Sequence, residues 1–131
     1  MSDEYRMDML MCKFPGGGLE YGEGTLDCLK REFKEELNIE IEIARHFYTT
    51  DYFQPALFFE NTQLISIYYL VTSANWPTIR TTKKTFDIKK VDGEQSFRWV
   101  NINELNAEEL TFPIDKKVAK MLTNPTMLLP Q

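Results

Sequence analysis

The sequence has few residues of the kinds that build several common sites. Its 131 residues include two cysteines and one histidine, and Cys12 and Cys28 do not have the spacing of a metal site. We therefore expect reduced thiols and a cytoplasmic location. No apolar run reaches the roughly 18 residues that a membrane span needs. The first residues also lack the basic and apolar segments of a signal peptide, so no membrane partner is expected.

Positive charge is also scarce. Lysine and arginine number 15 against 20 aspartate and glutamate residues, which gives a formal net charge of −5. This balance argues against nucleic-acid binding, which requires a basic surface. The most basic stretch, residues 80–90, is short and is interpreted as a solvated loop or edge strand. Its alternative role is to attract a phosphorylated small molecule.

The most informative stretch is a glycine-rich turn followed by an acidic helix. Gly16, Gly17 and Gly18 permit a tight loop, Thr25 is the predicted helix cap and Asn38 the predicted helix end. On such a helix Glu36 lies roughly 40° to one side of Glu32, and Glu35 lies roughly 60° to the other. The adjacent face is predicted to meet the core through Leu26, Leu29, Phe33 and Leu37.

Three carboxylates on one helix face repel one another and raise one another's pKa. A hard divalent cation removes this conflict, because Mg²⁺ favours oxygen ligands and commonly keeps waters and phosphate oxygens in its shell. The alternative interpretation is an ordinary solvated acidic face.

The surrounding residues favour the metal-binding interpretation. They fit the spaced pattern G-x5-E-x7-R-E-U-x-E-E-x-G-U, where U is a bulky apolar residue, and this pattern resembles the Nudix box of the Nudix (MutT-like) hydrolases. The last glycine of the pattern is Asn38 here, and asparagine also tolerates a left-handed conformation. The matching positions between 17 and 39 are Gly17, Glu23, Arg31, Glu32, Phe33, Glu35, Glu36 and Ile39.

The resemblance implies an α/β fold, a Nudix-type α/β/α sandwich with a mixed β-sheet in a single domain over residues 1–131. Strands are predicted at residues 9–14, 39–48, 63–72, 85–91 and 96–100, with 63–72 as a central strand buried on both faces. A helical turn is predicted at 104–110, a helix at 115–122 and a tail at 123–131. From this resemblance we expect the usual first strand or strands of the family to be absent. We therefore expect an open sheet edge that an upstream segment, another segment or a partner covers, so that a homodimer is one prediction.

The resemblance also implies an activity, the Mg²⁺-dependent hydrolysis of a nucleoside diphosphate linked to another moiety. Candidate substrates are nucleoside triphosphates, ADP-ribose-like compounds and sugar nucleotides, and Mn²⁺ is an alternative cofactor. One competing hypothesis is a catalytically silent Nudix-fold module that binds a nucleotide or regulates a partner, because fold alone does not establish turnover. A weaker one is a structural metal-binding domain.

Individual roles follow from the same resemblance. The implied metal ligands are Gly17 through its carbonyl, Glu32, Glu35 and Glu36, and the residues behind them are Glu23 and Arg31. The implied catalytic residues are Glu35, Glu36, Arg31 and Glu94. The general base is left open between a box glutamate and Glu94, with Asp92 a weaker alternative, and His46 is interpreted as an ordinary residue. The aromatic residues within 49–60 either stack on a base or sugar or complete the core.

Overall fold

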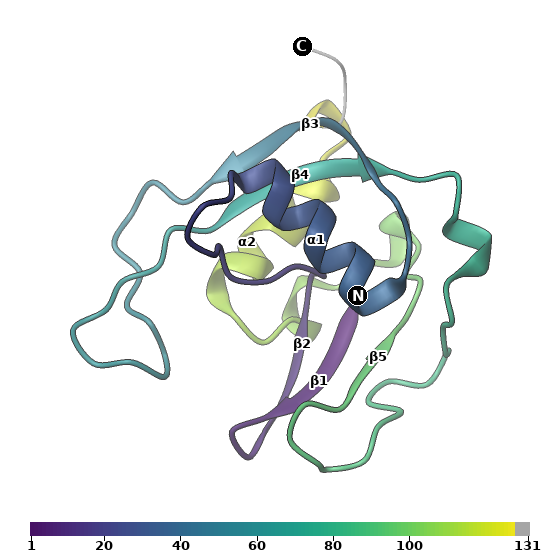
Figure 1. Ribbon diagram of the computed structural model, residues 1–131, viewed down its shortest axis with the longest axis horizontal. Helices are drawn as coiled ribbons and strands as arrows, with labels where there is room; N and C mark the ends of the chain where they lie inside the picture. Colours follow the sequence, from purple (N-terminus) through teal and green to yellow (C-terminus); the bar gives the residue numbers. More distant parts are fainter. Residues whose placement is uncertain (128–131) are drawn as a thin grey trace. The chain divides into compact units, whose positions relative to one another are not determined.

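The computed structural model describes residues 1–127 (Figure 1). Its contacts divide the chain into two compact units. One unit is formed by residues 1–16 together with residue 79 onward, and the other by residues 17–78. Within the described residues, no helix is both long and apolar enough to span a membrane.

The first unit contains a three-stranded antiparallel sheet. Strand β1 (Ser2–Arg6) lies between β2 (Met9–Lys13) and β5 (Gln95–Phe97). The strand predicted at residues 9–14 is therefore confirmed as β2, and the one predicted at 96–100 is shorter and begins one residue earlier. No strand is predicted at residues 2–6, yet β1 is the middle strand of this sheet.

Both edges of this sheet are partly covered by nearby segments of the same unit. On the β2 side, the Cys12 N–H donates to Thr111 Oγ1 at 2.8 Å, and the Thr111 N–H donates to the Cys12 carbonyl at 2.9 Å. On the β5 side, the Thr82 N–H donates to the Phe97 carbonyl at 2.9 Å. We expect an upstream segment, another segment or a partner to cover the sheet edge. These bonds show partial coverage by other segments of the chain.

Helix α2 (Pro113–Leu122) supplies much of the core of this unit. Proline stands at its first position, where its missing N–H costs no helical hydrogen bond. The helix buries Ile114, Val118 and Ala119, and Ala119 packs in one cluster with Cys12 and Leu110. The helix predicted at 115–122 is thus confirmed and begins two residues earlier.

A charged pair is buried in the same unit. Arg98 Nε donates to Asp3 Oδ2 at 2.6 Å, with Asp3 fully buried and the Arg98 side chain 10% exposed. Burial acts to raise the pKa of Asp3, but hydrogen bonds from Arg98 and from the Phe86 N–H outweigh it, so this pKa lies below its ordinary value of 3.8. Asp3 therefore remains ionised inside the unit.

The second unit contains helix α1 (Thr25–Leu37) and the antiparallel pair β3 (Glu42–Thr49) and β4 (Ile67–Thr72). Asn38 ends α1 in the left-handed conformation, with φ 53° and ψ 41°, as predicted. The predicted cap is wrong, because Gly24 occupies the N-cap position. The Thr25 hydroxyl is instead hydrogen-bonded to the Tyr69 hydroxyl of β4 at 2.7 Å.

The buried positions of this unit agree in part with those predicted, since Phe33, Ile39 and Ile41 are buried as expected and Leu26 is not. On α1 the buried residues are Cys28 and Phe33, whereas Leu26 is 43% exposed. Ile39 and Ile41 are buried but precede β3 rather than belonging to it. Phe33 packs edge-on against Trp76, which lies in the short 3-10 helix Trp76–Thr78.

Several predicted strands are wrong in extent or arrangement. Residues 63–66 do not belong to β4, and β4 pairs only with β3 among the described residues, so it is not a central strand. No strand forms at residues 85–91. Every strand pair within residues 1–127 is antiparallel, so the parallel pairing of a mixed sheet is not seen there. An apolar run shows where side chains can be buried, but the partners of a strand come from distant segments.

The C-terminal part contains short helical turns. The helical turn predicted at 104–110 is present as the 3-10 helix Ala107–Glu109, and a second 3-10 helix, Ile102–Glu104, precedes it. The predicted tail contains a further 3-10 helix, Pro125–Met127. Residues 128–131 of that tail lie outside the described residues.

Replacing Asp3 by alanine is predicted to lower the free energy of unfolding by about 3–5 kcal/mol, because Arg98 would keep a buried charge without its partner. Chemical denaturation at neutral pH measures this change. Glu108→Ala is the matched control, since Glu108 pairs with Lys116 at the surface of the same unit, and exposed pairs contribute about 1 kcal/mol or less.

The same pair predicts that the free energy of unfolding of the wild-type protein depends on pH, which chemical denaturation at a series of pH values measures. A carboxyl with a lowered pKa in the folded state contributes stability above its ordinary pKa of 3.8 and loses it as the pH falls through the folded value. If Asp3→Ala and the Glu108→Ala control have the same free energy of unfolding at pH 7, the buried pair does not stabilise the unit.

Candidate active site

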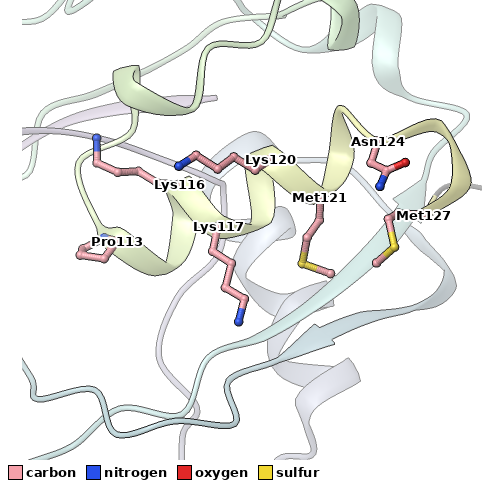
Figure 2. Close-up of a pocket in the computed structure, with 7 residues that line it drawn as sticks. All are labelled: Pro113, Lys116, Lys117, Lys120, Met121, Asn124 and Met127. Atoms are coloured by element: carbon pink, nitrogen blue, oxygen red, sulfur yellow. The ribbon is translucent and has the colours of Figure 1, made fainter.

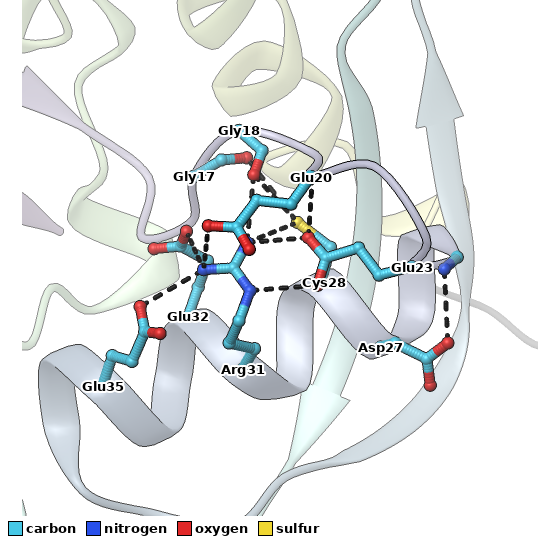
Figure 3. A network of polar contacts seen from close by, with 10 residues as sticks. Gly17, Gly18, Glu20, Glu23, Asp27, Cys28, Arg31, Glu32 and Glu35 are labelled. Carbon is cyan, nitrogen blue, oxygen red and sulfur yellow. Dashed lines mark hydrogen bonds and ion pairs between the residues drawn. The ribbon is translucent and has the colours of Figure 1, made fainter.

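Arg31 of α1 lies at the centre of a cluster of carboxylates (Figure 3). Its Nε and Nη2 atoms donate to the two carboxylate oxygens of Glu23 at 2.9 and 2.7 Å. Its Nη1 atom donates to Glu32 at 2.8 Å and to Glu35 at 3.2 Å. Glu20 Oε1 lies 3.8 Å from the same Nη1 atom. One guanidinium therefore holds two glutamates of the loop and two of the helix.

The electrostatics of this cluster keep its central pair charged. The hydrogen bonds from Arg31 are the main reason why the pKa of Glu23 falls to about 2. The pKa of Arg31 is raised, chiefly by the same hydrogen bonds with Glu23. Four carboxylates surround a single guanidinium, so the cluster has a formal surplus of three negative charges.

Gly17 and Glu32 approach each other so closely that a side chain at position 17 would displace the Glu32 carboxylate. A Cβ atom added to Gly17 would overlap with the carboxyl group of Glu32, whereas one added to Gly18 would meet nothing within 4 Å. The Glu32 side chain is 13% exposed. The carboxylate of Glu32 is thus packed against the backbone of the glycine loop.

Cys28 also joins the glycine loop to the helix. Its Sγ atom donates to the Gly18 carbonyl at 3.4 Å, and Arg31 Nη2 donates to the same carbonyl at 3.1 Å. Cys28 is 7% exposed. Burial, with a smaller contribution from the hydrogen bond to Glu23, raises the pKa of its thiol, so the sulfur stays a protonated donor.

The structure places Glu36 on the same helix, half-buried. No group of three or more histidine, cysteine, aspartate or glutamate side chains in residues 1–127 is arranged to hold a metal ion. The donors nevertheless suit Mg²⁺ chemically, since they are oxygen atoms with surplus negative charge. The Glu32 carboxylate also lies against the backbone of Gly17.

Of the later candidates, Glu94 and Asp92 belong to the other unit, whereas His46 belongs to the same unit as Arg31. Glu94 is exposed in the turn before β5, and its main chain is bonded to Val91 and Tyr5. Asp92 accepts a hydrogen bond from the Met7 N–H at 2.8 Å, which ties it to the turn between β1 and β2. His46 is exposed on β3, where its Nε2 is bonded to the Thr49 hydroxyl at 2.7 Å. None of the three has a contact with Arg31 among the interactions described.

A shallow groove of about 570 Å³ lies along α2, and none of its lining residues is a predicted site residue (Figure 2). The Lys116 ammonium group is bonded to Glu108 beside this groove. The lining residues are Pro113, Lys116, Lys117, Lys120, Met121, Asn124 and Met127. The groove shares no residue with the cluster around Arg31.

Comparison with protein families decides the assignment. The family model described as the NUDIX domain matches residues 3–122 of the sequence. The chain belongs to the Nudix family. The two α-helices and the antiparallel sheets of residues 1–127 are compatible with the α/β/α sandwich of a Nudix domain. A search of curated proteins gave no match to this chain.

Membership of the Nudix family indicates a hydrolase of phosphoric anhydrides, and such hydrolases generally use a divalent metal ion such as Mg²⁺. The matched range contains the whole stretch from Gly17 to Ile39 that resembles the Nudix box. The cluster around Arg31 is therefore the candidate active site of this Nudix domain.

The structure adds three participants that the sequence pattern does not single out. Glu20 joins the ion pairs of Arg31, Gly18 accepts hydrogen bonds through its carbonyl, and Cys28 donates one of them. Helical spacing alone could have indicated Cys28, because residues three apart share a face and Cys28 precedes Arg31 by three. Nothing in the spacing of Glu20 indicates that the loop returns it to the helix.

Gly17→Ala is predicted to lower the affinity for Mn²⁺ by roughly 10- to 100-fold, the effect typical of losing a group that orients metal ligands. The added methyl group would displace the Glu32 carboxylate and break its pairing with Arg31. Titration calorimetry measures the affinity. Gly18→Ala is the control, since its added methyl group has open space, and equal affinities for the two variants would contradict the role assigned to the close approach.

Proposed function

We propose that this Nudix domain is a divalent-metal-dependent pyrophosphohydrolase that cleaves a nucleoside diphosphate linked to another moiety. The observation that supports this most strongly is the surplus of negative charge around Arg31, where Glu32 and Glu35 lie beside the loop carboxylates. An oxygen-rich, negatively charged site that faces an anionic substrate requires a cation between the two.

In this proposal Glu32, Glu35 and Glu36 hold the ion together with the carbonyl of Gly17. When bound, the ion would neutralise phosphate charge and lower the pKa of a water molecule. Arg31 and Glu23 act behind these ligands. Arg31 fixes the rotamers of Glu32 and Glu35 through its hydrogen bonds, and Glu23 in turn holds the guanidinium with two bonds.

The general base is proposed to be a carboxylate, namely Glu35, Glu36 or Glu94. The Glu35 side chain is 59% exposed and Glu94 is exposed, so water reaches both. Asp92 is less suitable, because its carboxylate already accepts the Met7 N–H. A base must lie within hydrogen-bond reach of the water that it activates.

The proposed substrates are small nucleotide-type molecules, namely nucleoside triphosphates, ADP-ribose-like compounds or sugar nucleotides. The net charge of −5 supports a small substrate held by a metal rather than a nucleic acid held by a basic surface. Both cysteines are free, which agrees with the proposed cytoplasmic location. The family match runs through both units and supports a single Nudix domain over residues 1–131.

Glu36→Gln is predicted to reduce Mg²⁺-dependent hydrolysis by at least about 100-fold, since a metal ion supplies several kcal/mol and every 1.36 kcal/mol changes the rate tenfold. The substitution preserves shape and removes a charge. Glu42→Gln, on the exposed surface of β3, makes the same chemical change in the same unit and should keep the wild-type rate. Phosphate release measures both, and an active Glu36→Gln enzyme would remove Glu36 from the ligand set.

The substrate class is tested by a screen of nucleoside triphosphates, ADP-ribose and sugar nucleotides with Mg²⁺ and with Mn²⁺. We expect release of phosphate or pyrophosphate from at least one class, and none after chelation of the metal. Binding of a nucleotide without any turnover would instead support the silent regulatory module and contradict the proposed hydrolase.

A further inference from the structure

The connection between β3 and β4 exposes an unusual number of apolar side chains. Of the fifteen large apolar side chains that are exposed in the described part of the chain, seven lie within residues 52–65. The most exposed are Phe53 at 74%, Ile65 at 70%, and Leu57 and Phe59 at 63%. The other three are Tyr52, Phe58 and Leu64. The interpretation of these aromatic residues as part of the core is therefore wrong.

This segment, residues 50–66, is a defined hairpin, which we call the apolar arm. Its two sides are joined by backbone bonds from the Thr50 N–H to Ser66, from Leu64 to Gln54 and from Ala56 to Thr62, all 2.8 to 2.9 Å long. Pro55 and Gln63 form a bridge between them. Figure 1 shows the apolar arm extending past the ends of β3 and β4. The exposed side chains are thus carried on an ordered support.

The apolar arm carries almost no charge. Asp51 and Glu60 are its only acidic residues, and it contains no lysine or arginine. The Asp51 carboxylate accepts a hydrogen bond from the Tyr48 hydroxyl at 2.9 Å. An anionic membrane surface or a phosphate group would be recognised by basic residues, and the apolar arm offers none.

The summed exposed area of these side chains approaches that of one side of a protein interface. Seven large side chains that are 39% to 74% exposed present on the order of 700 Å² of apolar surface, taking about 150–250 Å² for a whole large side chain. A stable interface buries about 800 Å² on each partner. A stacked base occupies one ring face, so a nucleotide would leave most of this surface in water.

We propose that two copies of this chain associate through their apolar arms. An apolar surface of this size favours aggregation unless its partner is always present, and a second copy is present wherever the chain is made. The scarcity of charge gives no electrostatic preference for a different protein. Two identical arms can meet across a twofold axis, where each presents the same surface to the other.

The molar mass in solution tests this proposal independently of any hydrolytic activity. Light scattering after size exclusion should give the wild-type protein twice the chain mass of 15.4 kDa, unchanged in high salt because the contact is apolar. Phe53→Ser combined with Phe59→Ser should run at the mass of one chain. Val91→Ser is the control, as Val91 is an exposed apolar residue, at 55%, outside the apolar arm.

A second double variant, Leu57→Ser with Ile65→Ser, guards against a folding defect in the first, and far-UV circular dichroism checks both. A wild-type protein that runs as one chain at micromolar concentration would overturn the proposal. A double variant that is folded and still dimeric would do so too. If the wild type is monomeric and the variants raise KM or lower the melting temperature, the apolar arm serves the substrate or its own chain instead.

Discussion

The pairing of Arg31 with four glutamates is the interaction on which the candidate site depends. Glu20 and Glu23 belong to the loop after the glycines, whereas Glu32 and Glu35 belong to α1. Without a cation between them, these carboxylates would repel one another and separate the loop from the helix. The guanidinium can hold both groups because its donors are fixed in a fork that matches carboxylate geometry.

Steric fit supports this electrostatic arrangement. The loop lies on the helix because Gly17 has no side chain to meet the Glu32 carboxyl. The Gly18 carbonyl receives bonds from both Cys28 and Arg31, so the backbone of the loop is satisfied by the helix that it covers. A loop held at several points in this way positions its carbonyl oxygens and carboxylates before any ion or substrate binds, which is a requirement for efficient catalysis.

The two units show different solutions to an exposed sheet edge. In the first unit, Thr111 and Thr82 bond to the outer strands, so the edges are partly closed within the chain. In the second unit, β3 and β4 pair only with each other among the residues described, and the arm that joins them presents apolar side chains outward. A two-stranded ribbon is only marginally stable alone, so association through the apolar arm would stabilise the unit that carries the site.

The sequence by itself determined the features that depend on neighbouring residues. The left-handed helix end at Asn38 and the positions of Glu32 and Glu35 follow from local backbone preference and helical spacing. The resemblance of residues 17–39 to the Nudix box also indicated the family, and the family match confirms it. Only the tertiary structure placed β1 in the middle of its sheet, left Leu26 exposed, and kept residues 63–66 out of β4. An apolar side chain can be buried in many ways, and which surface covers it is decided by segments distant in the chain.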